Sequence, residues 1–241
     1  MSSDGFIRAF VTEVRNIYQT QDFIPLHAPV FKGEEKELVI EALESTFVSS
    51  VGKSVEEFET AIARYTGARY AVAVSSGTAA LHTALYAVGV ERGHEVITTP
   101  LTFVATCNAV SYCGARPAFV DVSLNSLGMS PTSLADFLEQ NAEVRDDGNC
   151  WNCSTESIIR ACVPVHNLGH PVEIEEIATI CGHYNISLIE DAAESLGSFR
   201  HAQHTGTVGR VGVLSFNGNK IITTGGGGAL ITNDEALAKR L

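Results

Sequence analysis

The distribution of lysine is the first chemical anomaly of the sequence. Lys220 is the only lysine between residues 54 and 238, and it stands in LSFNGNK, between an apolar run and four consecutive glycines. An amine held in a dry, positively biased pocket has a lowered pKa and can attack a carbonyl carbon to form an imine. A solvated lysine in a turn is the plainer interpretation, and the spacing alone leaves both open.

Polar side chains also follow two other apolar runs. Ser75-Ser76-Gly77-Thr78 follows YAVAV, and hydroxyls and free N–H groups at the start of a helix can hold a phosphate. Asp191, in IEDAA, ends a second apolar run. A buried carboxylate stays ionised only beside a cation such as a protonated pyridine or a metal. Ordinary helix caps remain the alternative interpretation of both segments.

Phe103 completes the set, because it follows a further strand end and a planar ring there can stack on a flat ligand. A core phenylalanine is the commoner explanation. A phosphate cradle, an aromatic face, a carboxylate and an isolated amine are together what pyridoxal 5′-phosphate (PLP) requires. A metal site is not expected, since the CxxC of Cys150 and Cys153 has no second pair.

The elements that must position these residues follow an alternating pattern from about residue 70. Helical periods separate the apolar runs, which predicts βαβ crossovers and an α/β fold with a mostly parallel sheet covered by helices on both faces. Ligands of such sheets bind at the carboxyl ends of the strands. The predicted strands are Tyr70–Val74, Glu95–Thr98, Arg116–Val120, Ile158–Val163, Ile186–Ile189 and Val211–Phe216. The predicted helices are one that follows Ser75-Ser76-Gly77 and ends at Val88, one over Phe103–Tyr112, one that begins at Ser130-Pro131, and one over Glu173–His183.

Two regions depart from this alternation. Lys32–Glu44 and Ser54–Tyr65 have the spacing of amphipathic helices, and Ser54 with Glu57 predicts a capping box at the start of the second. Residues 142–156 are polar and rich in turn formers, which predicts a surface insertion.

Composition excludes several classes of protein. The chain has 241 residues, of which 45% are hydrophobic and 18% charged, unlike a disordered protein. The net charge of −12 argues against nucleic-acid binding, which needs clustered Lys and Arg. No apolar run approaches the ~18 residues of a membrane span, so no membrane partner is expected. The N-terminus does not resemble a signal peptide, and the six cysteines do not form a disulfide framework, so a cytoplasmic location is expected.

The chain resembles the DegT-type sugar-nucleotide aminotransferases, a PLP-dependent family of fold type I, from about Ile24 to Leu241. It looks closest to the branch that aminates 4-keto-6-deoxy-N-acetylhexosamine nucleotides for nonulosonic (legionaminic-type) acids. The resemblance rests on FVSSVGKSVEEFE (47–59), SSGTAALHTAL (75–85), TFVATCNAVSYCGARPAFVDV (102–122), VPVHNLGHP (163–171), IEDAAESLGS (189–198) and HTGTVGRVGVLSFNGNKIITTGGGG (204–228).

This resemblance implies the large domain of that fold, with a sheet of the seven-stranded type. It implies an N-terminal segment over residues 1–30 and a PLP-binding domain over residues 31–241, without the small C-terminal domain that family members carry. It also implies a homodimer, a nucleotide-sugar substrate and an amino-acid donor, usually L-glutamate. The donor's amino group would pass through PLP to the C4 ketone of the sugar.

Residue roles follow from the same resemblance. Lys220 matches the lysine that bonds covalently to PLP and then moves a proton. Asp191 matches the carboxylate on the pyridine nitrogen. Phe103 and Ala193 match the residues on the two ring faces, and Glu194 matches the position near the cofactor hydroxyl.

The phosphate would bind to the turn of Ser76, Gly77 and Thr78, and to Ser215. His166 lies in a family motif but has no role that we can assign. In a related deoxygenating branch the lysine is replaced by histidine, so Lys220 favours transamination.

Two departures from the family leave alternatives open. Gly226 stands where the family usually has glutamate, and family members are longer than this chain. The chain is therefore either an aminotransferase or a truncated, non-catalytic remnant that binds PLP. An NAD-dependent enzyme on a Rossmann sheet is disfavoured, because GxGxxG does not occur.

Overall fold

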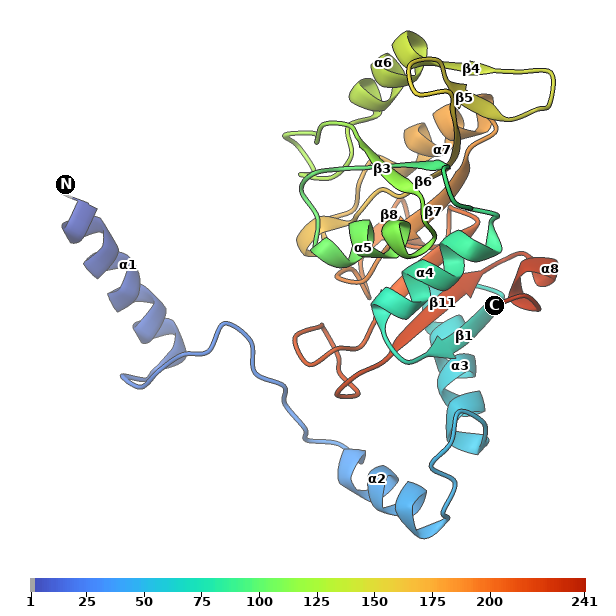
Figure 1. Ribbon diagram of the computed structural model, residues 1–241. Coiled ribbons are helices and arrows are strands. Elements are labelled where there is room, and N and C mark those ends of the chain that lie inside the picture. Colours follow the sequence, from blue (N-terminus) through green and yellow to red (C-terminus); the bar gives the residue numbers. More distant parts are fainter. Residues whose placement is uncertain (1–2) are drawn as a thin grey trace. The chain divides into compact units, whose positions relative to one another are not determined.

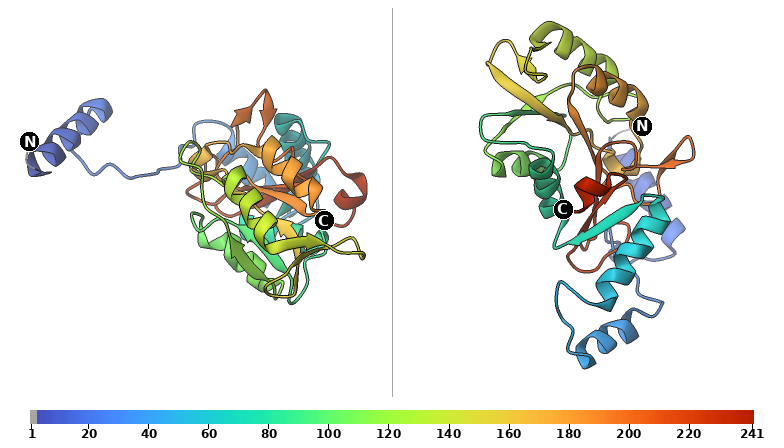
Figure 2. Two further views of the ribbon diagram at one scale, coloured as in Figure 1. Left: turned by 90° about the horizontal axis from the view of Figure 1, so that it is seen from above. Right: turned by 90° about the vertical axis from the view of Figure 1, so that its right-hand side faces the viewer.

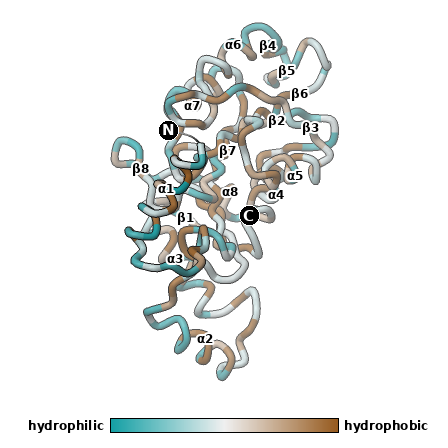
Figure 3. Tube along the Cα trace, turned by 90° about the vertical axis from the view of Figure 1, so that its left-hand side faces the viewer, coloured by the Kyte–Doolittle hydropathy of each residue, from teal (hydrophilic) through white to brown (hydrophobic). Residues whose placement is uncertain are grey.

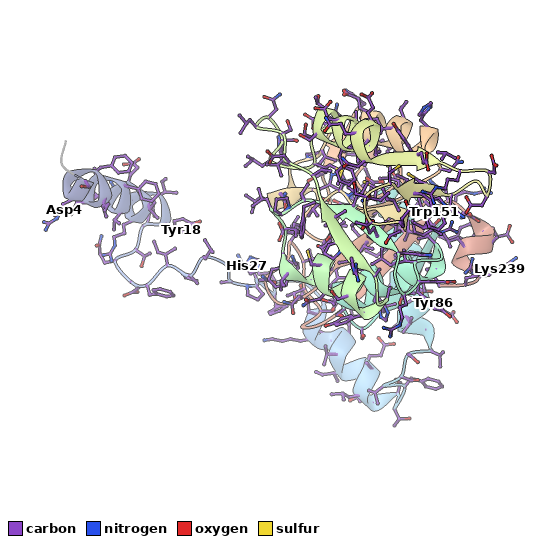
Figure 4. All side chains as sticks on the ribbon, turned by 45° about the horizontal axis from the view of Figure 1, so that its top comes forward. Asp4, Tyr18, His27, Tyr86, Trp151 and Lys239 are labelled. Carbon is purple, nitrogen blue, oxygen red and sulfur yellow. The ribbon has the colours of Figure 1, made fainter. Side chains whose placement is uncertain are left out.

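The computed structural model describes residues 3–241, and its internal contacts divide the chain into Met1–Phe31 and Lys32–Leu241. In the first unit, α1 (Ser3–Tyr18) is an amphipathic helix with hydrophobic and hydrophilic stretches (Figure 3). None of its residues is buried, and the Phe6 and Phe10 rings stack along it, between the labelled residues Asp4 and Tyr18 of Figure 4. No helix among residues 3–241 combines the length and the apolar character needed to cross a bilayer.

The second unit is built on one mixed sheet, whose main path runs β1-β11-β10-β7-β6-β2-β3 (Figure 1). The four pairings from β10 to β3 are parallel, while β11 is antiparallel to both of its neighbours. The strands are β1 (Tyr70–Val74), β2 (Glu95–Thr98), β3 (Arg116–Phe119), β4 (Ala142–Val144), β5 (Cys150–Asn152), β6 (Ser157–Cys162), β7 (Ser187–Asp191), β10 (Val211–Ser215) and β11 (Gly228–Thr232), with a separate hairpin of β8 (Phe199–Arg200) and β9 (Gln203–His204).

Helices cover both faces of this sheet (Figure 2). Successive strand residues point to opposite faces, so Ile189 packs in the core beneath α4 and α5, whereas Leu188 packs beneath α6 and α7. The helices of the unit are α2 (Glu35–Glu44), α3 (Lys53–Thr66), α4 (Gly77–Ala87), α5 (Val104–Tyr112), α6 (Pro131–Asn141), α7 (Ile174–His183) and α8 (Glu235–Ala238), with a 3₁₀ turn at Asn167–Gly169. The predicted α/β fold with a mostly parallel, doubly covered sheet is confirmed.

Two local predictions were wrong, and one strand was not predicted. The capping box at Ser54 and Glu57 does not form, because α3 begins at Lys53 with Gly52 as its N-cap. Residues 142–156 are not simply a surface insertion, since β4 and β5 pair antiparallel and join the sheet through β6. Strand β11 was missed, because its first residue belongs to a glycine run that is untypical of strands.

The carboxyl end of β7 is tied to two loops by one buried carboxylate, that of Glu190. Its oxygens accept hydrogen bonds from His166 Nε2 at 3.0 Å and from the backbone N–H groups of Gly206, Val208 and Gly209 at 2.8, 2.8 and 2.6 Å. Burial alone raises the pKa of Glu190, but the hydrogen bonds from His166, Gly209 and Gly206 outweigh it and hold the pKa below its ordinary value.

We expect Glu190→Gln to lower the free energy of unfolding at pH 7 by about 2–4 kcal/mol, because the amide places an N–H₂ group against N–H donors. A lowered native pKa stabilises the fold above the unfolded pKa of about 4.3, and this contribution is lost as the pH falls through the native value. Urea denaturation at several pH values should therefore show that the difference in unfolding free energy between wild type and Glu190→Gln becomes smaller below about pH 4.

Glu95→Gln is the matched control. Glu95 is also buried, but its carboxylate accepts one side-chain hydrogen bond, from Asn152 Nδ2 at 2.8 Å. Glu95→Gln should therefore lower the free energy of unfolding by less than Glu190→Gln does. Equal losses for the two variants, or a Glu190→Gln loss that persists unchanged in acid, would contradict the role given to Glu190.

Candidate active site

A cavity of about 270 Å³ lies at the carboxyl ends of β1, β7 and β10. Because β11 runs antiparallel to β1 and β10, its amino end, after Gly226 and Gly227, reaches the same edge of the sheet. The cavity brings together every site residue predicted from the sequence, namely Ser76, Gly77, Thr78, Phe103, Asp191, Ala193, Glu194, Ser215 and Lys220.

One wall of the cavity is the N-terminus of α4. Ser76 is the N-cap, and its Oγ accepts from the N–H of Ala79 at 3.1 Å, while its carbonyl accepts from the N–H of Ala80. The N–H groups of Gly77 and Thr78 lie in the first turn, where a helix offers no acceptor. A Cβ at Gly77 would lie 2.8 Å from Ser215 Cβ, so only glycine lets the helix approach β10 this closely.

The floor of the cavity carries Asp191, the last residue of β7, which is buried. Its Oδ2 accepts from Thr106 Oγ1 at 2.8 Å and its Oδ1 from the N–H of Ala193 at 3.2 Å. Burial raises the pKa of Asp191, and the hydrogen bonds and the charge of Lys220 offset this only in part. Among residues 3–241, no Lys, Arg or His side chain forms an ion pair with this carboxylate.

Lys220 reaches the cavity from the loop after β10, and its side chain is only 13% exposed. Its Nζ donates to Glu194 Oε1 at 3.2 Å and lies 6.0 Å from the centroid of the Phe103 ring. The Phe103 ring itself is 69% exposed. An amine, a carboxylate and an open aromatic ring thus stand side by side at one side of the cavity.

Other lining residues were not anticipated from the sequence. Thr106 stands one helical turn after Phe103, so the helical period of the predicted 103–112 segment is the signal that could have identified it. Asn217 and Asn219 share the loop of Lys220. Gly226 lines the cavity in an ordinary backbone conformation, and a Cβ there would meet only Ser75 O at 3.9 Å.

Residues of two other motifs do not line the cavity. His166 is fully buried and bonded to Glu190, and it does not line the cavity. Of the CxxC pair, Cys150 is buried while Cys153 is exposed, so the two thiols stand in different surroundings.

Comparison with known proteins places this geometry in a family. Residues 29–241 match the model of the DegT/DnrJ/EryC1/StrS aminotransferase family. A GDP-perosamine synthase of Escherichia coli O157:H7 is 38% identical over 218 residues, covering 90% of this chain and 55% of that protein. A putative pyridoxal phosphate-dependent aminotransferase, EpsN of Bacillus subtilis (strain 168), is 40% identical over 217 residues, covering 90% and 53%.

Among solved structures, an aminotransferase from Psychrobacter cryohalolentis superimposes with a TM-score of 0.78 at 33% identity, covering 91% of this chain and 51% of that one. The chain thus spans about half the length of the relatives that it matches. The match extends over most of the chain and includes every residue that lines the cavity. The chain belongs to the DegT/DnrJ/EryC1/StrS aminotransferase family.

Proposed function

We propose that this chain provides the cofactor-binding half of a PLP-dependent sugar-nucleotide aminotransferase. The observation that carries the proposal is the convergence of Lys220, Asp191 and the N-terminus of α4 on one cavity. PLP is the cofactor of the family, and the three features correspond to its aldehyde, its ring nitrogen and its phosphate.

The residues present fit that cofactor. The free N–H groups at the start of α4, with the Ser76 and Ser215 hydroxyls, suit a dianionic phosphate, which a helix N-terminus favours. Asp191 suits a protonated pyridine nitrogen, because the added cation would restore the ionised carboxylate that burial disfavours. Phe103 and Ala193 are the residues that we assign to the two faces of the ring.

The bound cofactor supplies an electron sink for the negative charge left when a proton leaves the amino-bearing carbon. Asp191 would maintain that sink by keeping the ring nitrogen protonated. Lys220 is the amine that we assign to covalent attachment and then to proton transfer. Glu194 accepts a hydrogen bond from Lys220 Nζ at 3.2 Å and would hold the amine at the side of the cavity before the cofactor binds.

For the substrate, we propose a nucleotide-linked 4-keto-6-deoxy sugar that is aminated at C4, with an amino acid such as L-glutamate as donor. The resemblance noted from the sequence favours an N-acetylhexosamine, whereas the relatives named GDP-perosamine synthase favour a GDP-linked sugar. The product would serve surface polysaccharide synthesis, and the enzyme would work as a homodimer.

The first test is covalent attachment of PLP. Purified chain mixed with PLP should develop a visible absorption band, and borohydride should fix the label on Lys220, as peptide mapping would reveal. Lys220→Ala should abolish both signals, whereas Lys239→Ala, at an exposed lysine, should change neither. A soluble wild-type chain without the band would refute PLP binding by this chain.

The second test uses the cost of burying Asp191. A raised native pKa penalises folding at pH values above the unfolded pKa, so Asp191→Asn should make the cofactor-free chain more stable at pH 7, with the gain vanishing near pH 4. The same variant should lose transaminase activity on the order of 100-fold, since charge stabilisation at the reacting centre is lost.

Glu194→Gln serves as the comparison, because Glu194 is partly exposed and does not face the same burial penalty. Its activity loss should be far smaller. Equal losses for the two variants, or a destabilised Asp191→Asn chain, would contradict the roles assigned to these carboxylates.

A further inference from the structure

We propose that the three consecutive residues His166, Asn167 and Leu168 form a positioning element that holds the cofactor-facing groups of the cavity in register, an inference that rests on the proposed function. None of the three lines the cavity. Each makes hydrogen bonds to a different segment that does contribute to the cavity. The element therefore acts through other residues and has no direct contact with the cofactor.

His166 fixes the end of β7. Its backbone N–H donates to the carbonyl of Asp191 at 3.0 Å, and its Nδ1 accepts from the N–H of Val172 at 3.2 Å. The remaining ring proton is therefore on Nε2, which donates to Glu190 at 3.0 Å. Asp191 and Glu190 are neighbours in the chain, so His166 holds the strand end by its main chain and by its side chain together.

Asn167 fixes the segment that carries Phe103. Its side chain is buried, and its Nδ2 donates to the carbonyls of Leu101 at 3.1 Å and of Leu127 at 2.7 Å. Leu101 precedes Phe103 by two residues, and α5, with Thr106, follows directly. One amide group thus joins the loop before α5 to the β7 side of the cavity.

Leu168 fixes Glu194. Its backbone N–H donates to Glu194 Oε2 at 2.9 Å, while the other carboxylate oxygen accepts from Lys220. Leu168 has a φ of 54°, a left-handed conformation that is costly for a residue with a branched side chain. Its side chain is 85% exposed, so packing does not impose that conformation. In this conformation the Leu168 N–H forms its hydrogen bond with Glu194.

Asp191, the Phe103 segment and Glu194 come from parts of the chain up to about 90 residues apart, and the three-residue element contacts all of them. Cofactor sites lose affinity when such supporting contacts are removed, because the groups that touch the ligand then sample a wider range of positions. Loss of one contact should therefore loosen a wall of the cavity without unfolding the sheet.

The test compares two buried asparagines. Asn167→Ala removes the link to Leu101, whereas Asn152→Ala removes a side chain that donates to Glu95 Oε2 at 2.8 Å, away from the cavity. Asn167→Asp keeps the shape of the side chain but cannot donate. Hydrogen–deuterium exchange of the peptide over residues 99–106, thermal unfolding, and titration with PLP monitored by its visible band are measured for all four chains.

We expect both alanine variants to be destabilised. Only Asn167→Ala and Asn167→Asp should show faster exchange over residues 99–106, a dissociation constant for PLP raised about tenfold, and a shifted absorption band, because donation by the amide is what orders the segment. Unchanged exchange in Asn167→Ala would overturn the proposal, as would normal PLP affinity despite faster exchange, or normal behaviour of Asn167→Asp.

The two proposals fail in different ways. A wild-type chain that does not bind PLP would refute the proposed function, and the exchange measurement would still decide whether Asn167 orders the Phe103 segment. A wild-type chain that binds PLP, with Asn167→Ala and Asn152→Ala behaving alike, would leave the proposed function standing and refute the positioning element.

Discussion

Two adjacent buried carboxylates at the end of β7 set the constraint on which the rest of the site depends. Because strand residues alternate between faces, Glu190 and Asp191 point to opposite sides of the sheet. The Glu190 carboxylate accepts four hydrogen bonds, which join the loop of His166 and the loop over residues 206–209 to the strand. The Asp191 carboxylate accepts two hydrogen bonds, and burial keeps its pKa above the ordinary value. A cationic ligand can stabilise a buried carboxylate whose pKa is raised by burial, which gives the cavity its chemical character.

Sheet topology explains why the other groups meet at this carboxylate. Parallel strands end at one edge, so the residues after β1, β7 and β10 converge there although they are distant in sequence. The antiparallel strand β11 adds its preceding loop to the same edge. The close contact between Gly77 and Ser215 then fixes the start of α4 against β10. Backbone geometry thus brings the start of α4, the Asp191 carboxylate and the Lys220 amine to one cavity.

The parts of the site predicted from sequence are those encoded locally. SSGT directly follows the apolar run YAVAV, and the acidic residues of IEDAA end another apolar run, so the sequence predicted that both lie at strand ends. Strand β11 was not predicted, because its pairing partners Ala71 and Val213 are distant and its glycines mask the pattern. The hydrogen bond between His166 and Glu190 joins the loop after β6 to strand β7, and only the pairing of these strands brings the two residues together.

The pairing of Lys220 with Glu194, in preference to Asp191, follows from the same difference in burial. The Glu194 side chain is 32% exposed, so its charge is partly solvated and an ion pair with it is weak and easily broken. A pair between Lys220 and the buried Asp191 would be costly to separate, because each charge would be left without water. If Lys220 has the covalent role proposed for it, its amine must leave its partner to react, and the partly exposed carboxylate of Glu194 releases it more easily. The proposed role of Asp191 at the ring nitrogen is compatible with this arrangement, because the buried carboxylate is not paired with Lys220.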